Sequence, residues 1–542
     1  MDTVELLNLR VAQAPDAVAH ESLTESLTYQ AWLDRSRQRA DELQTQGIRR
    51  GQRVTMRFTN EEMVRYAIDY VAVHLLGAVP VPINAAAIAG WLEEVESSAA
   101  VSWRMSPSGL VRVSETGTAT KDEVADILYT SGTTGVPRGY ECLMDEVYHI
   151  WEPLDGDDWT DRPIELHFAA LGSNYYQEMM RGPLLWGSHV VTLGFVQGKA
   201  LMQNLIDRHI NTLRLTPPAA SAVIRACSGI TIVGVDDISI SSAYCPESVL
   251  RSLAAVAPNA RIVNQYSATE SGRAKLKHVF GESPAGSLGR PVEGTQVRIM
   301  SEGGHELATG SVGGIQLRHE SAPVRRAMDG QAPTDDGFVE TGDLGYVDAD
   351  GWVYLVGRSR EIINVGGAKV APIQVEQMMR EIPGVEDVCV VSVPHPTLGE
   401  AVAAAVVSER SLQELWNDVV ATLVPPFTPV HLVYVGAIPT TLNDKPDKQR
   451  VRSIVLDAAE PSLSDAPEPM DESPIINLVA EILELDHPNV DLTWYEAGGD
   501  SLMALEAMVA IEDDFDVMVP SEYFTGLRRI KDLIEFFNRE AK

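Results

Sequence analysis

The sequence has few cysteines, and their positions exclude two common structural roles. Four cysteines occur among 542 residues, and none forms a Cys-x-x-Cys pair or stands near histidine at metal-ligand spacing. This is too sparse for a disulfide framework or a structural zinc site. Long apolar runs are missing too, because no stretch of about 18 consecutive apolar residues occurs. We therefore expect no membrane-spanning helix.

Positive charge is also scarce, with 43 basic against 77 acidic residues and a formal net charge of -34. A chain this acidic repels phosphate backbones and anionic lipids, so we expect neither a nucleic-acid nor a membrane partner. A polyanionic ligand such as ATP would need local cations, Mg²⁺ or backbone donors. The amino terminus lacks the basic start and apolar run of a secretory signal. The expectation is a cytoplasmic protein.

The composition that remains is that of a globular protein, with 45% hydrophobic and 22% charged residues. At roughly 150 residues per domain, the length allows three or four domains. Helical patterns alternate with short apolar runs up to about residue 355, beginning with a helix over 27–47, a strand over 53–58, a helix over 63–77 and a strand over 78–83. This alternation predicts an α/β fold with a largely parallel sheet.

Three changes of pattern follow. From about residue 357 the chain reads as a smaller α+β unit. Residues 454–473 mix proline, serine, alanine and acids without periodicity, which is typical of a flexible linker. Residues 474–542 carry 15 acidic and 5 basic residues in a short helical pattern. A small acidic helical bundle behind a linker indicates a mobile partner module.

The first chemical motif is ILYTSGTTGVPRG, residues 127–139. A strand enters a loop of serine, threonine and glycine, whose backbone N–H groups and hydroxyls suit phosphate oxygens. It is not a Walker loop, because the GxxxxGK[ST] spacing is absent. The string resembles the phosphate loop of the adenylate-forming superfamily, which includes acyl-CoA synthetases, luciferases and adenylation domains of nonribosomal peptide synthetases. The resemblance implies that the nucleotide contacts Thr130, Ser131, Gly132, Thr133, Thr134, Gly135 and Arg138, the last standing where lysine is usual.

Two further strings extend the resemblance. NQYSATESG, 264–272, is similar to the family's aromatic-Gly-x-Thr-Glu motif, with serine in place of the glycine. It implies that Tyr266 stacks on adenine, Thr269 contacts the α-phosphate and Glu270 binds Mg²⁺. ETGDLGYVDADGWVYLVGR, 340–358, looks like the ribose motif, in which Asp343 takes the ribose hydroxyls and Arg358 supports them. The DADG within it predicts a hairpin turn.

The remaining strings concern movement and catalysis. Residues 357–376 resemble the family's hinge and the first loop of its small C-terminal subdomain, with Arg360 as the hinge. Residues 438–452 resemble the loop of the catalytic lysine, which places Lys445 at that position and Asp444 where glycine is usual. Lys448 is a nearby rival. The family's behaviour implies that the 361–452 subdomain rotates between the two half-reactions.

The string WYEAGGDSLMALEAMV, 494–509, sets Ser501 at the start of an amphipathic helix. Serine and aspartate are common helix caps, which is the plainer reading. The string resembles the signature of acyl or peptidyl carrier domains, in which this serine carries 4′-phosphopantetheine. A helix N-terminus also suits the attached phosphodiester.

The resemblance implies a four-part architecture. An adenylation core with parallel sheets covers 1–357, a small α+β subdomain covers 358–453, a linker covers 454–473, and a four-helix carrier bundle covers 474–542. The implied function is ATP-dependent activation of a small carboxylic acid as an acyl-adenylate, then its loading as a thioester on the chain's own carrier. The setting would be nonribosomal peptide or polyketide biosynthesis, including that of antibiotics. The implied partners are a phosphopantetheinyl transferase and a downstream condensation, ketosynthase or acyltransferase enzyme.

The sequence indicates the identity of the acid less clearly than it indicates the reaction. Amino-acid-activating relatives place an aspartate in the segment that reads HFAALGSNYYQEMM here, and either alignment puts Asn174 or Ser173 at that position. Asparagine there resembles relatives that activate aryl acids, so we expect an aryl or other non-α-amino acid. Glu178 keeps an amine-bearing acid open. The expected wall residues are Asn174, Tyr175, Glu178, Thr216, Ile238, Ile240, Gln265 and Arg273.

Three alternatives stay open. One is a didomain that activates an α- or β-amino acid. The second is an acyl-CoA ligase with a fused carrier, since INVGGAKVAP looks like the CoA-ligase form of that loop. The third is a non-catalytic carrier and docking protein, suggested by the departures at Arg138, Ser267 and Asp444.

Overall fold

The computed structural model divides the chain into two compact units, Met1–Ser359 with Thr440–Lys445, and Arg360–Pro439 with Pro446–Lys542. The predicted boundaries at 357 and 453 stay predictions. The described residues are 1–87, 89–115, 120–121, 123–130, 137–148, 162–193, 199–227, 229–322, 325–329, 334–395, 398–441, 445–459, 474–483, 485, 490–494, 497, 501–515, 517–524 and 528–540.

The main sheet of the first unit has 13 strands in the order β16-β17-β19-β20-β15-β14-β13-β12-β11-β9-β10-β1-β2. The run from β13 to β1 is parallel, as the sequence predicts, and the run from β14 to β16 is antiparallel. The strands are β1 (Val18–Glu21), β2 (Ser26–Thr28), β9 (Ile164–His167), β10 (His189–Val191), β11 (Thr212–Leu215), β12 (Asp237–Ile240), β13 (Arg261–Tyr266), β14 (Leu276–Val279), β15 (Ser287–Pro291), β16 (Thr295–Met300), β17 (Gly313–His319), β19 (Val339–Val347) and β20 (Val353–Arg358).

Two smaller sheets complete the strands of this unit. A four-stranded sheet has the order β4-β3-β5-β6, and a three-stranded sheet has the order β18-β8-β7. In the latter, Thr130 pairs with Arg138, so the two ends of the expected phosphate loop lie opposite each other. The strands are β3 (Arg53–Phe58), β4 (Val79–Asn84), β5 (Trp103–Ser106), β6 (Gly109–Arg112), β7 (Val124–Thr130), β8 (Arg138–Leu143) and β18 (Arg326–Ala327).

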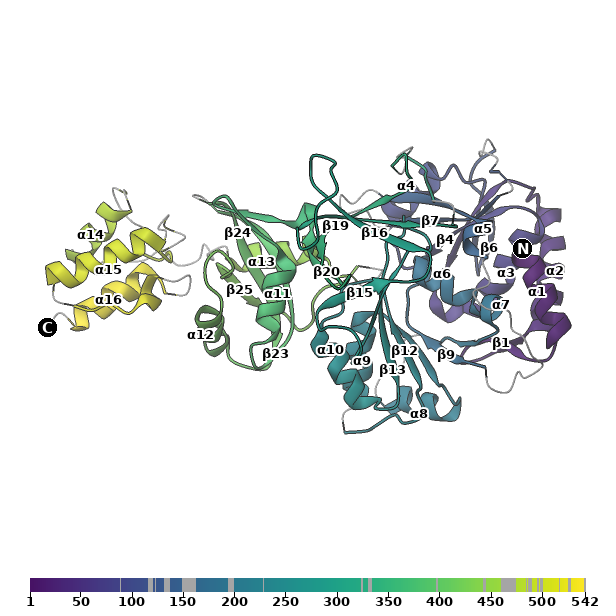
Figure 1. The fold of residues 1–542 in the computed structure, drawn as a ribbon, viewed down its shortest axis with the longest axis horizontal. Coiled ribbons are helices and arrows are strands. Elements are labelled where there is room, and N and C mark those ends of the chain that lie inside the picture. The colour runs from purple at the N-terminus through teal and green to yellow at the C-terminus, as the bar shows by residue number, and fades with distance from the viewer. Residues whose placement is uncertain are drawn as a thin grey trace. The chain divides into compact units, whose positions relative to one another are not determined.

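The helices of the first unit cover these sheets. Helices α9 and α10 lie beside the parallel strands in Figure 1, and their apolar faces share a buried cluster with β11 and β12. The predicted helix over 27–47 ends as expected, with Gly47 in the left-handed region at φ 114°. The helices are α1 (Thr3–Gln13), α2 (Tyr29–Gln46), η1 (Asn60–Glu62), α3 (Met63–Leu75), α4 (Ala89–Ser98), α5 (Met144–Val147), α6 (Asn174–Met180), α7 (Gly182–Trp186), α8 (Lys199–Asp207), α9 (Pro217–Ala226) and α10 (Glu247–Val256).

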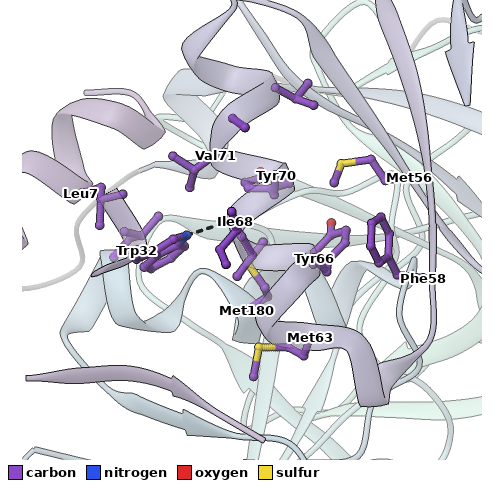
Figure 2. Packing of buried hydrophobic residues seen from close by; sticks show 14 of the residues in the cluster. Leu7, Trp32, Met56, Phe58, Met63, Tyr66, Ile68, Tyr70, Val71 and Met180 are labelled. Atoms are coloured by element: carbon purple, nitrogen blue, oxygen red, sulfur yellow. Dashed lines mark hydrogen bonds between the residues drawn. The ribbon is translucent and has the colours of Figure 1, made fainter. Parts of the chain in front are cut away.

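Helix α3 forms the centre of the largest core cluster, because apolar residues occupy nearly its whole circumference. Figure 2 shows Tyr66 and Tyr70 of this helix among Met56, Phe58 and Trp32. The Trp32 indole donates to the Ala67 carbonyl at 2.9 Å, which satisfies its buried N–H.

The second unit contains a five-stranded sheet whose central strands are buried on both faces. Alternate residues of β23 enter two different apolar clusters, one against α11 and α12 and the other against α13. The elements are η2 (Ser359–Glu361), β21 (Ile363–Val365), β22 (Ala368–Val370), α11 (Pro372–Arg380), β23 (Val385–His395), β24 (Gly399–Ser408), α12 (Leu412–Thr422), β25 (His431–Tyr434) and α13 (Lys448–Ala459).

Helix α13 continues through Ala459, so the first residues of the expected linker, from 454, are helical. The reason is packing, since Val451 and Val455 are one turn apart and both are buried against the sheet. Residues 460–473 of the expected linker lie outside the described residues.

The last part of the chain forms a small helical body around Trp494, which meets Phe524 edge to face with ring centroids 4.8 Å apart. Its described residues form three α-helices and one 3₁₀ turn, so the predicted four-helix bundle is not confirmed. They are α14 (Pro474–Ile482), α15 (Ser501–Phe515), η3 (Ser521–Phe524) and α16 (Ile530–Glu540). Within the part of the chain that the structure describes, no helix combines the length and hydropathy needed to cross a membrane.

Burial of several histidines in the first unit ties its stability to pH. His20 has no solvent exposure and packs edge-on against Trp32, with ring centroids 4.6 Å apart. Burial lowers the pKa of His20 to about 3, of His74 to about 3 and of His167 to about 4. The unfolded chain keeps pKa values of about 6.5 for these groups. It therefore binds protons below that pH that the folded chain does not bind.

We predict that the free energy of unfolding falls as pH is lowered from about 6.5 toward 5, by up to about 1.4 kcal/mol per pH unit for each buried histidine. Above about pH 6.5 these histidines are neutral in both states and the dependence disappears. Urea unfolding midpoints at pH 7.5 and 5.5 measure the effect. His20→Phe should flatten the dependence, whereas replacement of the exposed His305 by Gln should not. An unchanged slope in His20→Phe would contradict the assignment.

Candidate active site

The residues expected to bind the nucleoside come together at one end of the main sheet. The Tyr266 hydroxyl, at the end of β13, donates to Asp343 Oδ2 at 2.6 Å. Arg358 Nε lies 3.2 Å from Asp343 Oδ1. The Asp343 side chain is therefore held by one neutral and one charged donor. Burial and this carboxylate raise the pKa of Tyr266 well above its ordinary value, so the phenol stays a donor.

The pairing of Asp343 with Arg358 follows from the hairpin between β19 and β20. The two residues stand opposite each other in the antiparallel register. The hairpin closes at the predicted DADG turn, where Asp348 Oδ1 accepts from the backbone N–H groups of Asp350 (3.0 Å) and Trp352 (2.8 Å). Local turn chemistry thus sets the spacing of two residues expected to bind ribose.

Thr269 and Glu270 lie on a tight turn after β13. Gly272 closes this turn with φ at 56°, and a Cβ there would lie 3.2 Å from Glu146 Oε1, so both backbone angle and space favour glycine. Glu270 Oε1 accepts from the Tyr140 hydroxyl at 2.9 Å. Burial, then the Glu270 carboxylate, raises the pKa of Tyr140 above its ordinary value. The turn therefore lies against β8, the strand that leaves the expected phosphate loop.

Glu270 fits the expected role in binding Mg²⁺. An ionised carboxylate offers about four lone-pair sites, and the contact with Tyr140 uses one of them. Mg²⁺ is commonly held by one or two carboxylates together with substrate phosphates. Across the described ranges, no group of three or more histidine, cysteine, aspartate or glutamate residues is arranged to hold a metal ion.

The described ends of the phosphate loop are Thr130 and Arg138. Arg138 is one-third exposed, and its Nε lies 3.8 Å from Asp329 Oδ2. The contact is long and partly exposed to solvent, so this ion pair contributes little to stability. The other expected loop contacts lie outside the described residues: Ser131, Gly132, Thr133, Thr134 and Gly135.

A buried arginine that the sequence did not indicate lies behind this turn. Arg325 makes a bidentate ion pair with Glu146, at 3.0 and 2.9 Å. Its Nη1 also donates to Asn174 Oδ1 at 2.8 Å and to the Thr269 carbonyl at 2.9 Å. Burial alone lowers its pKa, but Cys142 and Glu146 raise the pKa of Arg325 above its ordinary value overall. Glu146 is 179 residues away in the chain, so no local pattern could reveal the pair.

The expected acid site surrounds the start of α6. Ser173, the alternative to Asn174 in alignment, caps this helix by accepting from the Tyr176 N–H at 3.1 Å. The Tyr175 hydroxyl donates to the Ser239 carbonyl, and Gln265 Nε2 donates to Ser239 Oγ, each at 3.1 Å. Two expected wall residues, Tyr175 and Gln265, therefore converge on one residue of β12.

Three other expected wall residues have charged or capping partners. Glu178 forms an ion pair with Lys275 at 2.5 Å, so its charge is already compensated. Thr216 caps α9 by accepting from the Ala219 N–H. Arg273 is buried next to the turn that Gly272 closes. Burial lowers the pKa of Arg273, and the nearby Glu146 opposes this effect.

The expectation for Ile238 and Ile240 is wrong. Both side chains are fully buried in the apolar cluster beneath α9 and α10. Residues of a strand alternate between faces, and on β12 the residue that reaches Gln265 is Ser239. The two isoleucines therefore face the core and do not line the acid site.

The two candidate lysines differ in their surroundings. Lys445 is half-buried in the segment assigned to the first unit, and its carbonyl accepts from the Thr441 N–H at 2.7 Å. Asp444 lies outside the described residues. Lys448 begins α13 and pairs with Glu361 at 2.5 Å. Burial alone lowers its pKa, but Glu376 and Glu361 raise the pKa of Lys448 overall, as expected for a structural ion pair.

The last two expected residues, Arg360 and Ser501, are located by the helices in which they lie. Arg360 lies in η2, at the division between the two units. Ser501 is the first residue of α15, a helix of 15 residues, and the preceding residues 498–500 lie outside the described ranges. A helix N-terminus attracts a phosphodiester, so this position fits an attached phosphopantetheine.

Comparison with protein families identifies three regions. Residues 86–322 match the AMP-binding enzymes, residues 374–445 match the AMP-binding enzyme C-terminal domain, and residues 473–537 match the phosphopantetheine attachment site. They follow one another in the order that the motifs predict.

Similar proteins include several ligases. Phenyloxazoline synthase MbtB of Mycobacterium sp. is 26% identical over 93% of this chain and 47% of its own length. Sulfoacetate–CoA ligase of Cupriavidus necator is 30% identical over 54% of this chain and 58% of its own length. The fatty acid–[acyl-carrier-protein] ligase ScoC of Streptomyces coeruleorubidus is 28% identical over 61% and 68%. The chain thus spans about half to two thirds of the length of these relatives.

Solved structures share the fold. The anthranilate CoA ligase AuaEII in complex with anthranoyl-AMP has a TM-score of 0.72 and 17% identity, over 85% of this chain and 98% of that one. O-succinylbenzoate coenzyme A synthetase (MenE) of Bacillus subtilis, in complex with AMP, has a TM-score of 0.70 and 17% identity over 87% of this chain. From the matched regions and the shared fold, the chain belongs to the adenylate-forming superfamily of AMP-binding enzymes and carries a phosphopantetheine attachment domain after them.

Proposed function

We propose that this chain activates a small carboxylic acid with ATP and loads the acyl group, as a thioester, on the phosphopantetheine arm at Ser501. The observation that carries the proposal is the hydrogen bond between Tyr266 and Asp343, which are 77 residues apart in the chain. It joins the motif expected to bind adenine and metal to the motif expected to bind ribose. Arg358, opposite Asp343, completes the cluster.

The chemistry needs ATP because a carboxylate does not react with a thiol, its leaving group being too poor. In the first step a carboxylate oxygen attacks the α-phosphate, and pyrophosphate leaves. In the second step a thiol sulfur attacks the acyl carbon, the thiol proton is released, and AMP leaves with the bonding electrons. Positioning and charge neutralisation account for most of the catalysis in such phosphoryl chemistry.

The residues divide this work. Asp343 and Arg358 orient the ribose, and Arg138 meets the phosphates. Glu270 would hold Mg²⁺, which would neutralise phosphate charge. Lys445 bridges the attacking carboxylate and the α-phosphate. The arm on Ser501 supplies the thiol once a phosphopantetheinyl transferase has attached it.

The acid is proposed to be an aryl or other non-α-amino acid. Neither alignment puts an aspartate at the expected position. One alignment gives Ser173, which caps a helix, and the other gives Asn174, which is neutral. Glu178, the remaining carboxylate on α6, is paired with Lys275. A buried ammonium without an available carboxylate costs several kcal/mol, so a site that selects α-amino acids normally supplies one.

The carrier supports a place in the biosynthesis of nonribosomal peptides or polyketides, antibiotics among them. A linear gramicidin synthase of Brevibacillus parabrevis is 24% identical over 94% of this chain and 7% of its own length. A condensation, ketosynthase or acyltransferase enzyme would then accept the acyl group. An acyl-CoA ligase with a fused carrier is the second candidate, favoured by the CoA ligases among the relatives. Acyl transfer to free CoA by protein lacking the arm distinguishes the two.

ATP–pyrophosphate exchange with aryl, β-amino, α-amino and short aliphatic acids tests the proposed reaction and substrate class together. The highest exchange should occur with an acid that has no α-amino group. Highest exchange with a proteinogenic α-amino acid would overturn the substrate class, and no acid-dependent exchange would overturn the function.

We predict that Lys445→Ala lowers adenylate formation by roughly 10²–10³, since a charge contact made in the transition state is worth about 3–4 kcal/mol. Thioester formation from preformed acyl-adenylate should survive. Lys448→Ala is the matched control and should lower the unfolding midpoint more than the exchange rate, because it leaves Glu361 without its partner. Exchange lost in Lys448→Ala but kept in Lys445→Ala would reassign the catalytic lysine.

We predict that Ser501→Ala abolishes acyl loading and leaves pyrophosphate exchange intact, because the arm takes part only in the second step. Intact-mass measurement after treatment with a phosphopantetheinyl transferase and CoA reports the attachment. Ser453→Ala, an exposed serine of α13, should gain the arm as the unchanged protein does. A pantetheine-sized gain on Ser501→Ala would refute the assignment.

A further inference from the structure

Arg325 determines how Asn174 presents its amide group. A guanidinium carries only donors, so the 2.8 Å contact between Arg325 Nη1 and Asn174 requires the amide oxygen on the arginine side. The two N–H donors of Asn174 are then directed elsewhere. Asn174 is half-buried at the first position of α6, where we expect the acid to bind.

The orientation of Arg325 is itself fixed on several sides. Its Nε and Nη2 meet both oxygens of Glu146, and the two side chains are 5% and 3% exposed. Its Nη1 also donates to the Thr269 carbonyl at 2.9 Å. A planar bidentate pair shielded from water has little freedom to rotate. The amide of Asn174 therefore cannot turn without breaking its contact with this fixed guanidinium.

The carboxylate on this helix has a cationic partner as well. Glu178 lies one turn after Asn174 and pairs with Lys275, whose side chain is 12% exposed. The two acceptors, Asn174 Oδ1 and the Glu178 carboxylate, thus both face cations. With its oxygen toward Arg325, Asn174 offers N–H donors to a ligand, and the Glu178 carboxylate, already neutralised by Lys275, attracts an ammonium less strongly.

We propose that Arg325 is a positioning residue for acid specificity. By taking the amide oxygen of Asn174 it directs the amide N–H groups toward the acid. The site then selects a carboxylic acid that bears a hydrogen-bond acceptor, such as a hydroxyl or carbonyl oxygen, and rejects the counterpart whose amino or ammonium group presents hydrogen-bond donors there. This inference rests on the proposed function and adds the substituent that the acid carries.

The test compares paired probe acids by kcat/KM in ATP–pyrophosphate exchange. The pairs are 2-hydroxybenzoate with 2-aminobenzoate, and 3-hydroxypropanoate with 3-aminopropanoate. In whichever pair is turned over, the unchanged protein should prefer the hydroxy acid by about tenfold or more, as expected for one satisfied hydrogen bond. Arg325→Lys keeps the charge but loses the planar fork, so its preference should fall to about twofold.

Two further variants separate this role from a general loss of structure. Arg325→Met combined with Glu146→Met removes both charges and leaves neither buried alone, so it should fold and show the same loss of preference. Arg104→Lys alters a bidentate pair with Glu96 that joins β5 and α4, and it should keep the unchanged protein's preference. Thermal unfolding midpoints verify that each variant is folded.

A preference for the amino acid of either pair in the unchanged protein would overturn the inference. So would a preference that is equal in the unchanged protein, Arg325→Lys and the double variant. Exchange with no acid at all in the unchanged protein would be a failure of the proposed function, seen before any variant is made, and would remove this inference with it.

Discussion

A buried ion pair between Arg325 and Glu146 holds the candidate active site together. It links the helix that follows the phosphate-loop hairpin to the turn that carries Thr269 and to the start of α6. Removing one partner of such a pair costs roughly 3–5 kcal/mol, because a buried charge is left uncompensated. These segments therefore stay in one arrangement, and the position of Asn174 depends on it.

The electrostatics of the site differ from those of the chain as a whole. The net charge of -34 opposes a polyanionic ligand, and the sequence therefore requires local cations for ATP. We propose that Arg358 and Arg138 supply them at the ribose and phosphate ends, and each is about one-third or more exposed. Arg325 is instead neutralised by Glu146 and acts through geometry. The exposed arginines thus supply charge to the ligand, and the buried arginine positions other side chains.

Local signals in the sequence were sufficient for much of the fold. The periodicity of α2 and α3 and the DADG turn predicted elements that the structure contains, and the hairpin places Asp343 opposite Arg358. The pairs of Arg325 with Glu146 and Lys275 with Glu178 span 179 and 97 residues, and only tertiary packing brings them together. The faces of a four-residue strand are also ambiguous in sequence, which is why Ile238 and Ile240 were wrongly expected beside the acid.

The central claim is that one chain both activates an acid and accepts it. Intact-mass spectrometry of the phosphopantetheinylated protein, incubated with ATP, Mg²⁺ and the acid that gives the most exchange, measures this directly. The account predicts a mass gain equal to the acid less one water, located on the peptide of Ser501 and dependent on ATP. No ATP-dependent gain on that peptide, with acyl transfer to free CoA in its place, would contradict it.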